Sequence, residues 1–163
     1  MKQLSNACNI SKKQIIIWHN AIFSSTERSI PTTVAFHDCF SHNVENLGRV
    51  HELAYDQVLE DTHAAYERLS GTYRVPSEGY YVFTWATCTY HGNVPLGLLV
   101  NGVVKGRSHS RSNANDDSAT GLVIISVAVN DAVIIRTHPD YDPHGIILSD
   151  KWQTSCFSGW KLN

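Results

Sequence analysis

A short stretch between Lys105 and Arg111 gathers side chains that could bind an anion. It reads Lys-Gly-Arg-Ser-His-Ser-Arg, so three cations and one histidine stand within seven residues. The planar guanidinium group of arginine presents a fork of hydrogen-bond donors that matches a carboxylate or a phosphate. We therefore predict that Arg107, His109 and Arg111 contact an anionic ligand. The alternative interpretation is a solvated loop whose arginines serve only solubility.

Two adjacent carboxylates, Asp116 and Asp117, follow in the same polar segment. Calcium takes several oxygen ligands, carboxylates among them, so the pair is a candidate calcium site. The alternative interpretation is a turn in which these side chains accept hydrogen bonds from backbone amides. We expect that the protein requires no cofactor. If the pair binds a metal, calcium is the ion that it would favour.

A second polar stretch, residues 138–153, combines acidic and aromatic side chains. Carboxylates accept hydrogen bonds from sugar hydroxyl groups, and aromatic rings stack on the apolar faces of sugars. The alternative interpretation is a turn-rich loop that its own tyrosine holds in place. The predicted ligand-binding residues of this stretch are Asp140, Tyr141, Asp142, His144 and Trp152.

Histidine is frequent, with nine in 163 residues. Imidazole binds zinc and copper, and it titrates near physiological pH. However, no two histidines stand in a His-x-x-x-His spacing that would place them on one side of a helix. We expect scattered surface groups, and a secreted protein that binds calcium or heavy metals stays open as an alternative function.

Several function classes find no support in the sequence. There is no Gly-x-Ser-x-Gly, no His-Glu-x-x-His and no phosphate-binding loop, so we expect no catalysis. A net charge of −2 gives no reason to expect nucleic-acid binding. The apolar runs are far shorter than the roughly 18 residues that indicate a membrane-spanning helix, so we expect no membrane insertion.

The four cysteines, Cys8, Cys39, Cys88 and Cys156, are widely spaced. The absence of a Cys-x-x-Cys pair argues against a zinc site of four cysteines. Four cysteines allow three complete pairings, and the sequence does not choose among them or against small buried thiols. The first residues lack the apolar stretch of a signal peptide. We expect that a signal peptide was removed from a secreted protein; the alternative is a protein not secreted by that route.

Strands must position these polar segments, and the central strand lies within residues 71–88. This stretch reads as a short strand, a turn and a long strand. In the long strand Tyr81, Phe83 and Trp85 fall on one face, because successive side chains of a strand point to opposite sides. The other face is also partly apolar, which favours a layered β structure.

The rest of the chain predicts short strands and no clear helix, which is typical of an all-β sandwich or jelly roll. Residues 49–60 suit either a helix or two short strands. Asn101-Gly102 is the strongest hairpin signal. We further expect a turn over 91–95, a strand pair joined at Asn130-Asp131, and loops over 108–118 and 138–153. An N-terminal arm over residues 1–30, without a collagen-like repeat, precedes a domain over residues 31–163.

The central stretch also resembles a family signature, that of the globular head domain of complement C1q. The resemblance covers about residues 32–162, and the loop 144–149 is similar to molluscan members of the family. Asp38 departs from the family pattern, because a small residue is common there. The motifs that carry the resemblance are Gly71-x-Tyr73-x-x-Pro76-x-x-Gly79-x-Tyr81-x-Phe83, Val34-Ala-Phe36, Val100-Asn-Gly102 and Phe157-Ser-Gly159.

The resemblance implies a ten-stranded jelly-roll sandwich like that of tumour necrosis factor, assembled as a homotrimer or a higher oligomer. It also implies a secreted recognition protein of innate immunity without catalytic residues. Such a protein would bind glycans, sialic acid among them, or other anionic patterns of microbial surfaces. A module that mainly drives self-assembly is the alternative that the sequence leaves open.

Overall fold

The computed structural model describes residues 33–162, so the expected N-terminal arm lies outside the described residues. The described chain is built from strands and contains no helix long and apolar enough to cross a membrane. The strands are β1 (Ala35–Cys39), β2 (Gln57–Asp61), β3 (Tyr66–Glu67), β4 (Thr72–Arg74), β5 (Gly79–Val100), β6 (Val103–Arg111), β7 (Asp116–Val127), β8 (Ala132–Thr137), β9 (His144–Leu148) and β10 (Cys156–Lys161).

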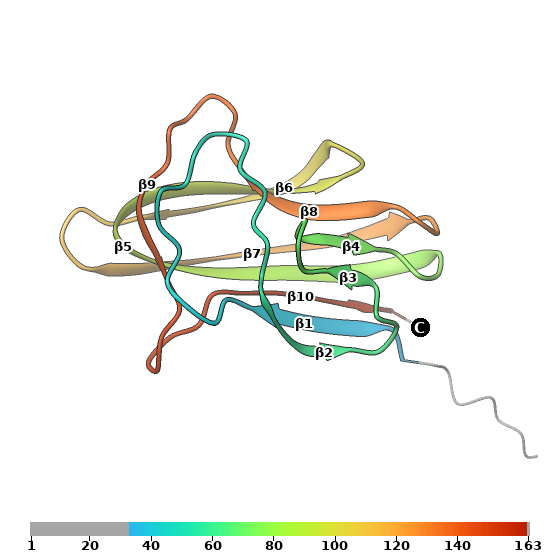
Figure 1. Ribbon diagram of the computed structural model, residues 1–163. Coiled ribbons are helices and arrows are strands. Elements are labelled where there is room, and N and C mark those ends of the chain that lie inside the picture. The colour runs from blue at the N-terminus through green and yellow to red at the C-terminus, as the bar shows by residue number, and fades with distance from the viewer. Residues whose placement is uncertain (1–32, 163) are drawn as a thin grey trace, which may run out of the picture. The chain divides into compact units, whose positions relative to one another are not determined.

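One long strand, β5, takes part in both layers of a sandwich (Figure 1). Its residues 79–90 pair with β10 and β7, and its residues 93–100 pair with β6 and β8. The first layer therefore has the order β2-β1-β10-β5-β7, and the second has the order β6-β5-β8-β4-β3. All pairings are antiparallel, and the prediction of an all-β jelly-roll sandwich is confirmed.

The core lies between the layers, and the aromatic face of β5 fills its centre. Tyr81, Phe83 and Trp85 are 0%, 0% and 1% exposed, which confirms the predicted alternation. Gly121 lies directly opposite Trp85, and any Cβ atom there would overlap the indole ring. The indole N–H donates a hydrogen bond to Ser108 on β6, 2.6 Å away, so Trp85 links the two layers.

The turn at Asn101-Gly102 is also confirmed. Val100 and Val103 pair across it, and both turn residues have positive φ, 49° and 81°. This is the geometry that favours Asn-Gly in tight hairpins.

The predicted strand pair at Asn130-Asp131 is wrong. The strands that flank it, β7 and β8, pair with different parts of β5 and so lie in different layers. Asp131 stabilises the connection between the layers, because its carboxylate accepts hydrogen bonds from the Ala128 N–H at 2.8 Å and the Asn101 side chain at 2.7 Å. Asn130 and Asp131 are residues that favour a chain reversal, but a reversal does not determine which strand β8 pairs with.

Three other predicted boundaries are wrong. The expected turn at 91–95 is a kink inside β5, where His91 has φ of 45° and the register shifts before Asn93. The expected loop over 108–118 consists mostly of the ends of β6 and β7, and the expected loop over 138–153 contains β9. At 91–95 the residues Gly, Asn and Pro are typical of a turn, and at 108–118 the solvent-facing strand residues are polar, so composition alone suggests a turn or a loop.

The closing strand β10 lies between β1 and β5. Its register places Cys156 directly opposite Cys39, and the two form a disulfide. The sequence leaves this pairing open. Cys88 has no disulfide partner among the described residues.

Candidate ligand-binding surface

The predicted cations lie on one face of β6. Arg107, His109 and Arg111 alternate with less exposed residues, and all three point to solvent. Within residues 33–162 neither arginine forms an ion pair, so both guanidinium groups are available to an anionic ligand. Residues two apart in a strand are about 6.5 Å from each other, so the row spans about 13 Å.

The two predicted polar segments meet at His109. Its ring lies 6.4 Å from the Tyr141 ring, measured between centroids, at an interplanar angle of 62°. Its Nε2 atom makes a hydrogen bond with Asn93 Oδ1, and the strand register places Asn93 opposite both Arg111 and His144. Residues from β5, β6, β9 and the 138–143 turn thus converge. We call this group the basic strip, and its residues are Asn93, Arg107, His109, Arg111, Tyr141 and His144.

The structure does not bring the other predicted residues of 138–153 to this strip. Asp142 lies 3.8 Å from Arg49 in an exposed ion pair. Trp152 is 82% exposed, with the Lys151 ammonium group 4.8 Å from the centre of its ring. The Asp140 N–H donates to His138 Nδ1 at 3.1 Å, which holds a local turn. In the described structure Asp140 and Trp152 therefore contact neighbours in the sequence, and Asp142 contacts Arg49, which is outside the basic strip.

Asp116 and Asp117 do not converge either, because adjacent residues of a strand point to opposite faces. Asp117 accepts hydrogen bonds from the Arg111 N–H at 2.8 Å and the Ser110 hydroxyl at 3.2 Å. The first of these contacts is the main reason that its pKa lies below the ordinary value. Asp116 accepts a hydrogen bond from Gln153, 3.3 Å away. Asp117 thus supports the β6–β7 turn, Asp116 contacts the segment between β9 and β10, and calcium binding by the pair stays a prediction.

Sequence reasoning missed two residues of the surface, Asn93 and Arg136. Gly97 lies between Arg107 on β6 and Arg136 on β8, so the second arginine extends the positive charge across the layer. The Arg136 Nε atom is buried without a hydrogen-bond partner in the described structure. Alternation with the buried Val133, Ile135 and Thr137 could have placed Arg136 outside, whereas nothing local pairs Asn93 with His109.

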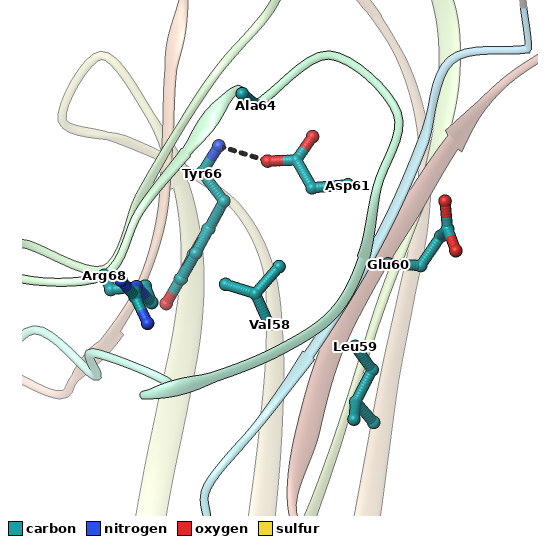
Figure 2. A pocket seen from close by; sticks show the side chains of 7 residues that line it. All are labelled: Val58, Leu59, Glu60, Asp61, Ala64, Tyr66 and Arg68. Atoms are coloured by element: carbon teal, nitrogen blue, oxygen red, sulfur yellow. Dashed lines mark hydrogen bonds between the residues drawn. The ribbon is translucent and has the colours of Figure 1, made fainter.

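A separate hollow of about 450 Å³ lies at the edge of the sandwich between β2 and β3 (Figure 2). Asp61 is part of its wall and accepts a hydrogen bond from the Tyr66 N–H at 2.8 Å. Next to this edge Asp38 is fully buried, and neither of its carboxylate oxygens has a hydrogen-bond partner in the described structure. The hollow contains none of the predicted ligand-binding residues.

Comparison of solved structures shows the same sandwich. The globular domain of zebrafish complement 1qA is similar at a TM-score of 0.65 and 15% identity, covering 80% of this chain and 98% of that one. Eiger TNF from S. frugiperda gives 0.61 at 12% identity, covering 81% and 94%. Murine APRIL at pH 5.0 gives 0.58 at 14% identity, covering 80% and 99%. At these identities the likeness shows the fold.

The sequence itself supplies the family. No curated protein sequence matches this chain. The family model of the C1q domain matches residues 35–162, which is nearly the whole described sandwich and well over half of the chain. Domains of this kind are generally binding and assembly modules rather than enzymes. The signature around β5, the layer order and the match over residues 35–162 agree, and the chain belongs to the C1q domain family.

Proposed function

We propose that this protein is a secreted trimeric lectin of innate immunity that binds anionic glycans, sialic acid among them, through the basic strip. The observation that carries the proposal is the contact between His109 and Tyr141, which joins an aromatic ring to a row with two arginines that form no ion pair in the described part of the chain. An arginine fork suits the carboxylate of a sugar acid, and a tyrosine ring suits the apolar face of a sugar.

Secretion is supported by the Cys39–Cys156 disulfide, because disulfides persist mainly in oxidising compartments. A single exposed site of this kind binds weakly. A trimer presents three copies of the strip, and simultaneous contacts raise the overall affinity without any new interaction.

The outer face of the first layer supports the trimer. Trp160, Val82 and Ile124 lie directly opposite one another on β10, β5 and β7, and Leu122 and Tyr80 continue the same face. Ile124 and Leu122 are each 59% exposed, and Tyr80 is 61% exposed. A contiguous apolar surface on a soluble domain indicates a protein contact, and closed symmetry is the usual arrangement for identical chains.

The glycan proposal predicts that Arg111→Ala keeps the fold but weakens binding about tenfold or more, because a charge-assisted hydrogen bond contributes about 1.5–3 kcal/mol. A glycan array with the purified full chain identifies the ligand, and surface plasmon resonance measures the loss. Arg68→Ala is the matched control, since Arg68 is also exposed but lies in the turn after β3. Absence of binding to any sialylated or bacterial glycan would overturn the proposal.

The assembly proposal predicts that Ile124→Glu converts the trimer into monomers, because three carboxylates would be buried in apolar contacts. Light scattering after size exclusion measures the mass of the particle. Leu69→Glu is the control, since Leu69 is 92% exposed but lies in the turn after β3. A variant at Ile124 that stays trimeric would show that this face is not the interface.

A further inference from the structure

Three metal-ligating side chains meet on the outer face of β1 and β10. His37, Cys39 and Cys156 each offer one ligand atom, and these atoms lie within 4.8 Å of one another. This is the one such group of three among residues 33–162. His37 and Cys39 are two apart on β1, so they share a face, and Cys156 lies opposite Cys39 on β10. One chain thus supplies all three.

The spacing of the histidine and the first sulfur already suits a metal. His37 Nε2 lies 3.6 Å from Cys39 Sγ. In a tetrahedral zinc site, Zn–N bonds of about 2.0–2.1 Å and Zn–S bonds of about 2.3 Å put the nitrogen and the sulfur about 3.5 Å apart. The two sulfurs would have to separate from their disulfide bond to about 3.8 Å by the same geometry. Opening the disulfide is therefore the main change required.

The second ring nitrogen of His37 has the partner that a metal ligand needs. Nδ1 lies 2.7 Å from the Ser158 hydroxyl oxygen. In the tautomer with its proton on Nδ1, the ring donates to Ser158 and leaves the Nε2 lone pair directed towards Cys39. Metal-bound histidines almost always make such a contact with their other nitrogen, which fixes the tautomer and the ring orientation. His37 is exposed in the single chain, so a metal ion could reach the site before three chains close the outer face of the first layer.

The geometry points to a redox-switched site for a thiophilic metal ion, zinc or copper(I), formed by His37, Cys39 and Cys156. In the oxidised chain the disulfide occupies both sulfurs. Two molecules of an external thiol reduce it: the S–S bond breaks, two protein thiols form, and the reductant becomes a disulfide. The two thiols then lose two protons as the metal binds both thiolates and the neutral imidazole. Thiolate and imidazole ligands favour zinc and copper(I) over calcium.

Cobalt(II) is the probe for this site, because it replaces zinc in tetrahedral sites and reports thiolate ligands by their charge-transfer absorption. The full chain should carry Cys8→Ser and Cys88→Ser, so that Cys39 and Cys156 are its only cysteines. After reduction by a phosphine we expect one cobalt ion per chain with a thiolate charge-transfer band, which zinc abolishes. The oxidised chain should show no such band, and peptide mapping without reduction should recover the Cys39–Cys156 link.

Two variants separate the site from general thiol binding. His37→Gln should weaken cobalt binding by more than tenfold, and Ser158→Ala by about tenfold, as for loss of an outer-shell hydrogen bond. His42→Gln, which changes an exposed histidine outside the group, should have no effect. Equal affinity in the wild type and His37→Gln would overturn the proposal. So would loss of the β-sheet circular dichroism signal on reduction without cobalt binding.

Discussion

Replacing Tyr81 with alanine is expected to lower the free energy of unfolding by about 3–5 kcal/mol, the usual cost of removing a large buried ring. Tyr81 is fully buried, and its ring stacks on Phe83 with centroids 5.6 Å apart. Its hydroxyl donates to the Ser77 carbonyl oxygen at 2.9 Å, which ties the start of β5 to the preceding turn. Domains have only about 5–15 kcal/mol in total, so the variant should lose a large fraction of its stability.

Urea unfolding followed by tryptophan fluorescence measures this loss, and two variants divide it. Tyr81→Phe keeps the ring and removes the hydroxyl, so it should cost about 1 kcal/mol. Tyr90→Ala removes a ring that is 41% exposed on the same strand and should cost about 0.5 kcal/mol. If Tyr81→Ala were no less stable than Tyr90→Ala, the centre of the core would lie elsewhere.

The second large effect comes from Asp38, whose carboxyl group is 0% exposed. Burial, and then the nearby carboxylate of Asp61, raise its pKa from 3.8 to about 7. The folded state therefore keeps the proton at a pH where the unfolded chain has lost it. Stability contributed by this proton is complete below about pH 4, falls as the pH rises, and is lost above about pH 7.

The size of this effect follows from the shift. Each pKa unit corresponds to 1.36 kcal/mol, so a shift of about three units costs the folded state about 4 kcal/mol at pH 8. Asp38→Asn is neutral in both states and should remove this slope. At pH 8 the variant should be more stable than the wild type by about 1–3 kcal/mol, less than the full value because the amide is also left without a partner.

Urea unfolding of both proteins from pH 4 to pH 8 provides the measurement, and the difference between the two curves isolates Asp38. Carboxylates with lowered pKa, such as Asp131, lose their contribution to stability as the pH falls. Both proteins contain these carboxylates, so the difference between the two curves does not include them. Asp142→Asn is the control, since it removes an exposed carboxylate and should leave the slope unchanged. Parallel curves for Asp38→Asn and the wild type would mean that Asp38 is already charged at neutral pH without penalty.

Features with a local cause could be predicted from the sequence. The alternation of Tyr81, Phe83 and Trp85 gives the inner face of β5, because strand side chains alternate whatever their neighbours are. Asn101-Gly102 gives a tight hairpin, because both residues tolerate positive φ. Arg107, His109 and Arg111 were predicted as a group only from their closeness in the sequence, whereas their common face follows from β6, which the sequence did not predict beyond Arg107.

Features that depend on register could not be predicted. Nothing near Asn93 indicates that it will lie opposite both Arg111 and His144, and nothing near Cys39 indicates Cys156 as its partner. The kink at His91 changes the layer without ending the strand, so the turn signal at 91–95 does not mark a strand boundary. The jelly-roll topology was predicted from the resemblance to the C1q family, because local sequence patterns do not determine which strands pair.

Because β5 belongs to both layers, neither layer can detach as an independent folding unit. Removing either one would leave half of a 22-residue strand without its hydrogen-bonded neighbours. Open sandwiches joined only by loops can lose one sheet while the other persists, but this domain has a continuous backbone through its centre. Local damage at Trp85 or Leu98 should therefore be transmitted along β5, and unfolding should be cooperative across the whole sandwich.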